Sequence, residues 1–231
     1  KSGKVLMVNY THRWAPPYAE AKNVIDSGKI GFPVMAYARK NDTINVITEW
    51  LPWLVNSTPP AFLSSHDIDL IHWFFNSEAK VVYAQAFDNI LKSKGINTLD
   101  AVQAFVRFEN EAIATFESCW IYPNSFPTST DSYIEIVFEK GVIHLDRKKE
   151  IMEVADESNF TYPKLSISHR VGGKLEGAFR SSILHFIDSI IENKKPLTSG
   201  EEARKVAEIV EAIHLSIKKG RPIFLPLGGN K

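Results

Sequence analysis

Residues 101–120 read AVQAFVRFENEAIATFESCW. This stretch contains two strand-like runs, 101–108 and 112–120, joined by the short polar connection Glu109-Asn110-Glu111, which is typical of a hairpin. The same arrangement recurs at 132–146, where a Glu-Lys-Gly connection joins two further runs. Because connections this short join antiparallel neighbours, the middle of the chain predicts an antiparallel sheet.

Helical patterns flank these strands. Pro16-Pro17 opens a helical stretch with Gly28 at its C-cap, Ser64-Ser65-His66-Asp67 supplies a serine N-cap with an acid three residues later, and two helices close the chain at 178–193 and 200–219. The remaining strand-like runs are 5–8, 32–39, 80–87 and 151–154, while 41–60 and 156–177 predict surface loops. The expected fold is therefore α+β: an open, predominantly antiparallel β-sheet with helices packed on one face.

Composition limits the class of protein. The 231 residues are 44% hydrophobic, and 27 basic residues balance 27 acidic ones, so no net field favours nucleic acid or an anionic membrane as a partner. This balance favours a small, near-neutral ligand. No apolar run reaches the roughly 18 residues that a membrane span needs. The single cysteine, Cys119, excludes an internal disulfide and indicates a reducing, cytoplasmic compartment.

The densest polar cluster is His66-Asp67-Ile68-Asp69, at the start of an otherwise apolar helix. The positive end of a helix dipole lowers the pKa of a histidine there, so His66 can serve as a neutral base or hydrogen-bond partner for a hydroxyl. Asp69, one turn on, could orient His66 or bind a second hydroxyl. The alternative interpretation is structural: the aspartates complement the dipole and His66 fills a packing contact.

The same helix also raises the question of a metal site. His66, Asp69 and His72 follow one another at intervals of three residues. The two histidines are separated by about 600° of helical rotation, which leaves them roughly 120° apart around the helix. They share a face poorly, so we expect no metal, although a metal-dependent hydrolase stays open as an alternative.

Aromatic side chains in predicted loops are candidates for stacking on a sugar ring. The four candidates are Trp50, Trp53, Tyr122 and Tyr162. Arg13 belongs to the set of candidate binding residues because the segment Thr11-His12-Arg13-Trp14 follows the first strand, and ligands bind at the carboxyl ends of parallel strands. Arg13 could equally well form a salt bridge between domains.

Three motifs, in this order, resemble the glucose-fructose oxidoreductase, inositol dehydrogenase and MocA family of nicotinamide-dependent enzymes. Residues 4–14 with 25–31 resemble the crossover that leaves the last strand of that family's Rossmann domain. Residues 65–73, SHDIDLIHW, are similar to its H-x-x-D helix, and 186–197 with 221–226 are similar to its closing helices and strand. The resemblance runs nearly from end to end.

The resemblance implies more than a fold. It implies a dihydrodipicolinate-reductase-like C-terminal domain over residues 13–231 that binds substrate and oligomerises through its sheet face, with residues 1–12 as the last strand and crossover of a Rossmann domain that is absent. NAD or NADP would bind to that N-terminal domain, because the chain contains no G-x-G-x-x-G motif and no residue to which cofactor binding can be assigned. By position, His66 would be the acid/base partner of a substrate hydroxyl and Asp69 a pocket residue.

The implied parent enzyme is a dehydrogenase of a sugar, an inositol or a related polyol, and the fragment alone is expected to be inactive. Four residues before His66, where many members of the family carry an aspartate, Phe62 stands instead. A phenylalanine holds no proton. The alternative from another class is therefore a non-catalytic sugar-binding or assembly module of the same fold.

Overall fold

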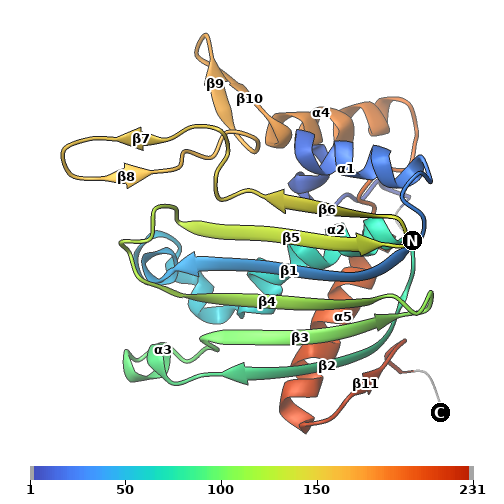
Figure 1. Cartoon of the computed structure of the whole chain (residues 1–231), viewed down its shortest axis with the longest axis horizontal. Helices are drawn as coiled ribbons and strands as arrows, with labels where there is room; N and C mark the ends of the chain where they lie inside the picture. Colours follow the sequence, from blue (N-terminus) through green and yellow to red (C-terminus); the bar gives the residue numbers. More distant parts are fainter. Residues whose placement is uncertain (1–2, 229–231) are drawn as a thin grey trace.

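The structure is a computed structural model that describes residues 3–228. Within these residues a seven-stranded sheet forms the centre of the molecule (Figure 1). Its strands, in spatial order, are β11 (Ile223–Phe224), β2 (Ala79–Phe87), β3 (Ala101–Phe108), β4 (Ile113–Tyr122), β1 (Pro33–Thr43), β5 (Thr130–Phe138) and β6 (Gly141–Asp146). All pairs are antiparallel except β1 with β4, so the prediction of a predominantly antiparallel sheet is confirmed.

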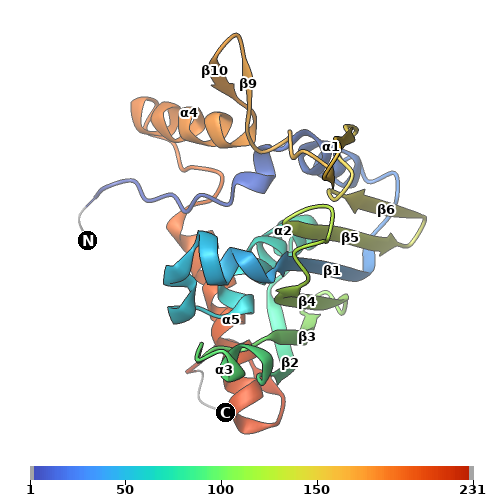
Figure 2. The ribbon, with the colours of Figure 1, turned by 90° about the vertical axis from the view of Figure 1, so that its left-hand side faces the viewer.

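Helices occupy one side of this sheet. The helices are α1 (Pro16–Asp26), α2 (Ser65–Phe75), α3 (Ile90–Ser93), α4 (Ala178–Ile191) and α5 (Gly200–Lys219), and the shorter turns are η1 (Thr11–Trp14), η2 (Val46–Trp50), η3 (Pro52–Asn56) and η4 (Pro60–Ser64). Figure 2 shows the sheet nearly edge-on, with α2 and α5 against one face and no element against the other. Two small hairpins, β7 (Val154–Ala155) with β8 (Phe160–Thr161) and β9 (His169–Val171) with β10 (Lys174–Glu176), project from the end near α4.

The core lies between the sheet and α2 and α5. Alternate residues of each strand point toward the helices and are apolar, for example Val102, Ala104 and Val106 on β3, which are all buried. They meet the buried stripe of α5, including Val206 and Ile213. Every second residue of a strand is buried, and so is one stripe of each helix that recurs about every 3.6 residues. These two apolar surfaces cover each other, so the sheet and the helices pack as two layers.

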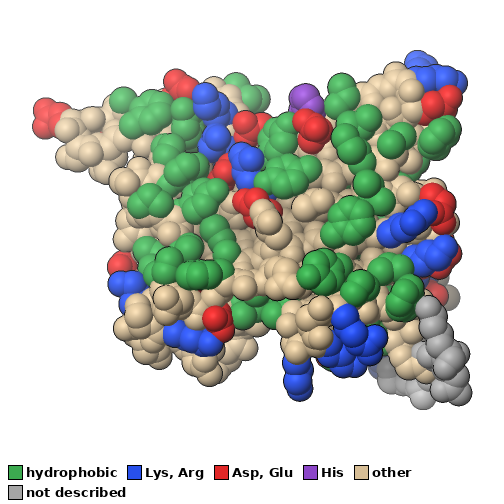
Figure 3. Space-filling model, turned by 60° about the horizontal axis from the view of Figure 1, so that its bottom comes forward, with side chains coloured by type: hydrophobic (Ala, Val, Ile, Leu, Met, Phe, Trp, Pro, Cys, Tyr) green, Lys and Arg blue, Asp and Glu red, His purple; other side chains and the backbone are tan. Residues whose placement is uncertain are grey.

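The opposite face of the sheet is open to solvent and only partly polar. One cross-strand row on this face runs from Tyr83 through Phe105 and Thr115 to Tyr37, then through Glu135 to His144. In Figure 3 hydrophobic side chains gather on the visible surface between scattered charged ones. Phe105 is 43% exposed, so this face carries apolar area that the described residues leave uncovered.

One expectation about an element end is wrong. Ser64 does not cap α2 with its side chain, because the π-helical turn η4 runs directly into α2 and leaves Ser64 with helical φ and ψ angles. Residues 5–8 make one strand-like contact, a bridge from Met7 to Ser199, and Leu6 is 64% exposed. The neighbours that a strand buried on both faces needs are not among the described residues.

Two other segments differ in extent. Residues 41–60 are less irregular than expected, since β1 continues to Thr43 and the turns η2 and η3 follow. The run 151–154 is almost entirely outside strands, with β7 beginning only at Val154. Within residues 3–228, no helix combines the length and apolar character that crossing a membrane requires.

Candidate functional site

A polar pocket of about 280 Å³ lies on the helix side of the sheet, at the carboxyl end of β1. Lys40 and Asp42 enter it from β1 because they continue the inward-facing positions that Ala36 and Ala38 occupy earlier on the strand. The other lining residues are His12, Val46, Trp50, Leu51, Phe62, Leu63, His66, Ser129, Thr130 and Arg147. The ionisable acid and bases Asp42, Lys40 and Arg147 lie among the lining residues, so the pocket combines burial with convergent polar groups, the usual character of a ligand site.

His66 lines this pocket from the first turn of α2. Its ring lies 4.8 Å from the ring of His12 and 6.0 Å, edge to face, from that of Tyr10. Burial, with Lys40 and Arg147 nearby, lowers the pKa of His66 to about 3, so the imidazole is neutral at pH 7. The Nδ1 atom is buried without a hydrogen-bond partner among the described residues. The lower pKa expected from sequence is therefore present, and burial is its main cause.

Lys40 and Asp67 form a buried ion pair beside the two histidines. Lys40 Nζ lies 2.9 Å from Asp67 Oδ1 and 3.5 Å from His12 Nε2. Burial lowers the pKa of His12 far below its usual value, and the neighbouring Lys40 acts in the same direction. His12 is thus neutral and can accept a hydrogen bond from Lys40.

Arg13 and Asp69 are brought together, but away from the pocket. Arg13 Nη2 and Nε donate to the two oxygens of Asp69 at 2.7 and 2.9 Å, and both side chains are almost fully buried. Arg13 also donates to the carbonyl of Leu197 at 3.1 Å and lies 5.0 Å from the ring centre of Trp73. Neither residue lines the pocket. Their bidentate pair connects η1 to α2 and to the segment before α5.

The four aromatic candidates are dispersed. Trp50 lines the pocket, whereas Trp53 is exposed and packs its ring against Phe62, 5.7 Å away. The Tyr122 hydroxyl accepts a hydrogen bond from Asn41, and Tyr162 lies beside Phe160. Of the four, Trp50 is the one that the structure places where it can contact a ligand in this pocket.

His72, the second histidine of the metal alternative, points elsewhere. Its Nε2 lies 3.5 Å from a carboxylate oxygen of Glu78, and its Nδ1 lies 3.8 Å from one of Glu202, on the far side from the pocket lining. Within residues 3–228, no three His, Cys, Asp or Glu side chains converge as metal ligands.

Cys119 is buried, which raises the pKa of its thiol to about 11.

Sequence reasoning missed His12, Lys40, Asp42 and Arg147. The signal for two of them was present: Lys40 and Asp42 are charged residues at inward-facing positions of a strand whose earlier inward positions are alanines. No comparable signal marks Arg147, which follows β6 and enters the pocket through the path of the chain after residue 146.

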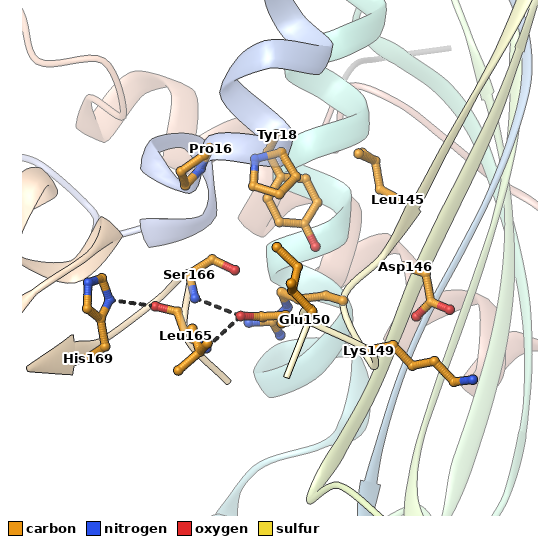
Figure 4. A pocket seen from close by; sticks show the side chains of 12 residues that line it. Pro16, Tyr18, Leu145, Asp146, Lys149, Glu150, Leu165, Ser166 and His169 are labelled. Atoms are coloured by element: carbon orange, nitrogen blue, oxygen red, sulfur yellow. Dashed lines mark hydrogen bonds between the residues drawn. The ribbon is translucent and has the colours of Figure 1, made fainter. Parts of the chain in front are cut away.

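A second cavity of about 370 Å³, shown in Figure 4, shares Arg147 with the lining of the first. Its walls come from α1, the end of β6 and the segment 165–169, and are largely apolar. Glu150 points into it and accepts hydrogen bonds from the backbone N–H groups of Leu165 and Ser166 at 2.6 and 2.7 Å.

The described residues do not fit a dinucleotide. Helix N-termini bind phosphates through free N–H groups, but α1 begins with Pro16 and Pro17 and α2 continues a preceding turn. The first turn of α4 donates to the carbonyls of Ser166 and Ile167, and Ser199 Oγ accepts from the first turn of α5. None of these ends presents a cradle for a pyrophosphate.

The chain thus combines an open, predominantly antiparallel sheet, helices on one face and a pocket with charged lining residues at the end of β1. A family model described as "Oxidoreductase family, C-terminal alpha/beta domain" matches residues 22–225. The chain belongs to the Gfo/Idh/MocA oxidoreductase family, which confirms the resemblance inferred from the three sequence motifs.

Individual proteins agree with this assignment. The chain is 21% identical to the uncharacterized oxidoreductase YrbE of Bacillus subtilis, over 97% of this chain and 64% of that protein. The structure of myo-inositol 2-dehydrogenase from Lactobacillus plantarum superimposes with a TM-score of 0.79 at 18% identity, over 97% of this chain and 66% of that one. Scyllo-inositol dehydrogenase from Lactobacillus casei, solved with NAD(H) and scyllo-inositol, gives 0.73 at 20% identity, over 93% and 63%. The chain thus spans slightly less than two thirds of each relative.

Proposed function

We propose that this chain is the substrate-binding part of an NAD(P)-dependent dehydrogenase that acts on a CH–OH group of a sugar, an inositol or a related polyol. The observation that carries the proposal is the polar pocket, in which neutral His66 lies among Lys40, Asp42 and Arg147. Two proteins of similar fold are named as inositol dehydrogenases. Hydroxyl groups need both donors and acceptors, and the pocket offers both.

Within this proposal His66 contacts the reacting hydroxyl. An unprotonated ring nitrogen accepts a hydrogen bond from an O–H group, and Trp50 at the pocket wall offers a ring face to the C–H side of a sugar. A base with a pKa near 3 holds a proton only briefly, so His66 orients the hydroxyl and passes its proton on to solvent water. Since the described residues do not fit the dinucleotide, no step through the nicotinamide is assigned to this chain.

We further propose that the cofactor binds to an N-terminal Rossmann domain that precedes these residues, with 1–12 as its last strand and crossover. Helix α4 supports this proposal, because it exposes a stripe of large apolar side chains. The stripe consists of Phe179, Ile183, Leu184, Ile187, Ile190 and Ile191. Such a continuous apolar surface marks an interface. Leu6, also exposed, lies on the segment that runs past α4 in Figure 2.

The open sheet face is proposed as the site of homo-oligomerisation. Its partly exposed row of Tyr83, Phe105 and Tyr37 supplies apolar area between charged groups, the composition of an interface between protomers. The balanced charge and single buried cysteine support a cytoplasmic protein with no nucleic-acid or membrane partner.

A second candidate is a non-catalytic sugar-binding or assembly module. Phe62 favours it, because this apolar side chain lines the pocket at the position where the family resemblance led us to expect an aspartate. The ring of Phe62 cannot hold a proton or orient His66 by a hydrogen bond.

Turnover by the full-length protein tests the proposal. Assayed with NAD and NADP against inositols and aldoses, it should oxidise at least one of them, and His66→Ala should lower kcat by about 10²-fold or more if this residue relays the hydroxyl proton. His214→Ala, which removes a histidine of α5 outside the pocket, is the matched control and should leave kcat unchanged. Saturable sugar binding with no turnover in the full-length protein would instead establish the second candidate.

A further inference from the structure

Arg147 is a buried cation that forms no ion pair among residues 3–228. Its side chain is 9% exposed, none of the ion pairs within residues 3–228 involves it, and its Nε has no hydrogen-bond partner there. A guanidinium cannot lose its proton in a protein, so it does not escape the cost of burial by becoming neutral. The guanidinium of Arg147 is therefore suited to bind an anionic group of a ligand.

The carboxylates around Arg147 do not fill that role. Asp67 is paired with Lys40 at 2.9 Å, and Glu150 accepts from the N–H groups of Leu165 and Ser166 on the side of the second cavity. Asp42 lines the pocket without an ion pair, and burial raises the pKa of its carboxyl, which weakens it as a counter-ion. The positive charge of Arg147 is therefore available to a ligand.

Lys164 adds a second cation at this end of the pocket. Its Nζ donates to the carbonyl of Thr130, a lining residue, at 2.8 Å. Burial, together with the charge of Arg147, lowers its pKa to about 7. Two cations that destabilise one another in a buried place are both stabilised when an anion binds between or beside them.

We propose that the pocket takes a sugar or polyol that carries an anionic group, a carboxylate or a phosphate, and that Arg147 binds this group. The inference rests on the function proposed above and names its substrate class. The planar guanidinium can bind two oxygens of either anion at once, while His66 and Asp42 remain for the hydroxyls of the ring. The net charge of the chain led us to expect a near-neutral ligand, whereas the positive charge of Arg147 in the pocket favours an anionic one.

The second cavity, which Arg147 also lines, is not the place for this anion. Its wall contains the carboxylates of Glu150 and Asp146, and most of its remaining lining is apolar, including Leu145, Ile151 and Leu165 (Figure 4). An anion there would face like charges, whereas the first pocket has hydroxyl-binding groups and Lys40.

Calorimetric titration of the full-length protein with two matched ligand pairs tests the inference. D-glucuronate is compared with D-glucose for the carboxylate, and myo-inositol 1-phosphate with myo-inositol for the phosphate. At least one anionic member should bind roughly 10- to 100-fold tighter than its neutral partner. Arg147→Gln should remove this preference while retaining the weaker neutral binding, and Arg147→Lys should keep part of it, since charge remains but the fork geometry is lost.

Lys149→Gln is the matched control. It removes one positive charge from an exposed residue that lines only the second cavity, so the preference should persist. Equal binding of both members of each pair, binding of neither, or a preference that survives Arg147→Gln would overturn the inference. Tight binding of an anionic sugar without any oxidation would remove the proposed function alone, while oxidation of neutral polyols with no anionic preference would remove this inference alone.

Discussion

Arg13 and Asp69 show how a pair of plausible ligand-binding residues can serve the fold instead. Both belong to motifs that resemble the family, and both were predicted to contact substrate. In the structure their charges satisfy each other at 2.7 and 2.9 Å, and neither lines the pocket. The possibility of a salt bridge was already open for Arg13, but a sequence gives no distance between residues 56 positions apart.

Breaking this pair should be costly. Arg13→Met leaves the carboxylate of Asp69 buried without a partner, so the free energy of unfolding should fall by about 3–5 kcal/mol. The double variant Arg13→Met/Asp69→Leu removes both charges and should recover most of that loss. Urea unfolding of the four proteins of this double-mutant cycle measures the coupling. A loss below about 1 kcal/mol for the single variant would show that the pair is solvated.

The buried histidines of the pocket predict a loss of stability in acid. His66 has a pKa of about 3 in the folded chain against 6.5 when unfolded, and the pKa of His12 is lowered too. As the pH falls below 6.5, the unfolded state takes up protons that the folded state does not bind, so unfolding becomes more favourable until about pH 3. For His66 alone, the loss between pH 7 and pH 5 should be up to about 2 kcal/mol.

Urea unfolding at both pH values, for the wild type and for His66→Gln, measures this contribution. The variant should lose less stability between pH 7 and pH 5 than the wild type. His144→Gln is the control, since His144 is exposed on the opposite face of the sheet. Parallel curves for the wild type and His66→Gln would contradict the assignment of a buried neutral imidazole.

Among the elements, strands and long helices were predicted well because their apolar periods are regular. The runs 101–108 and 200–219 coincide with β3 and α5, and Gly220 has the positive φ of a helix stop. The errors fall where tertiary contacts decide. Ser64 sits inside a continuous helical path rather than at its start, and the parallel pairing of β1 with β4 brings together strands far apart in sequence.

The candidate site was less predictable than the fold for the same reason. His66 was found because it belongs to a dense polar cluster beside an apolar helical pattern, which is a local signal. His12, Lys40 and Arg147 converge on it from three other places in the chain. The net charge of the whole sequence is zero, so it does not reveal that basic side chains gather at one place in the fold.

Helix α4 carries a prediction about the proposed cofactor domain. Ile187→Lys should change the free energy of unfolding of the 231-residue chain by no more than about 0.5 kcal/mol, because the side chain is exposed there. In the full-length protein the same change should cost about 1–2 kcal/mol and increase cleavage between the domains in limited proteolysis, since an apolar contact is lost. Phe32→Lys, at a site before β1 that is 64% exposed against 45% for Ile187, is the control. Equal effects of Ile187→Lys on both lengths of protein would contradict docking on α4.

For the whole molecule, the open sheet face predicts assembly. Light scattering should show the wild type as a dimer or a larger oligomer at micromolar concentration. Phe105→Lys places a charge at the centre of that face and should shift the population toward monomer, whereas Phe32→Lys should not. A monomeric wild type at this concentration would count against the sheet face as an interface.

The position of β1 has a consequence for the newly synthesised polypeptide. Tyr37 pairs with Thr115 on one side and Glu135 on the other, so neither neighbour of this strand exists when the ribosome releases it. At roughly 5–20 residues per second, the nascent strand waits about 5–20 s for its second partner to be made. During that interval its backbone N–H and C=O groups can pair with other nascent chains. Production in a cell should therefore depend on chaperones that shield β1 until β4 and β5 have been made, and slower growth at low temperature should favour the correctly folded product.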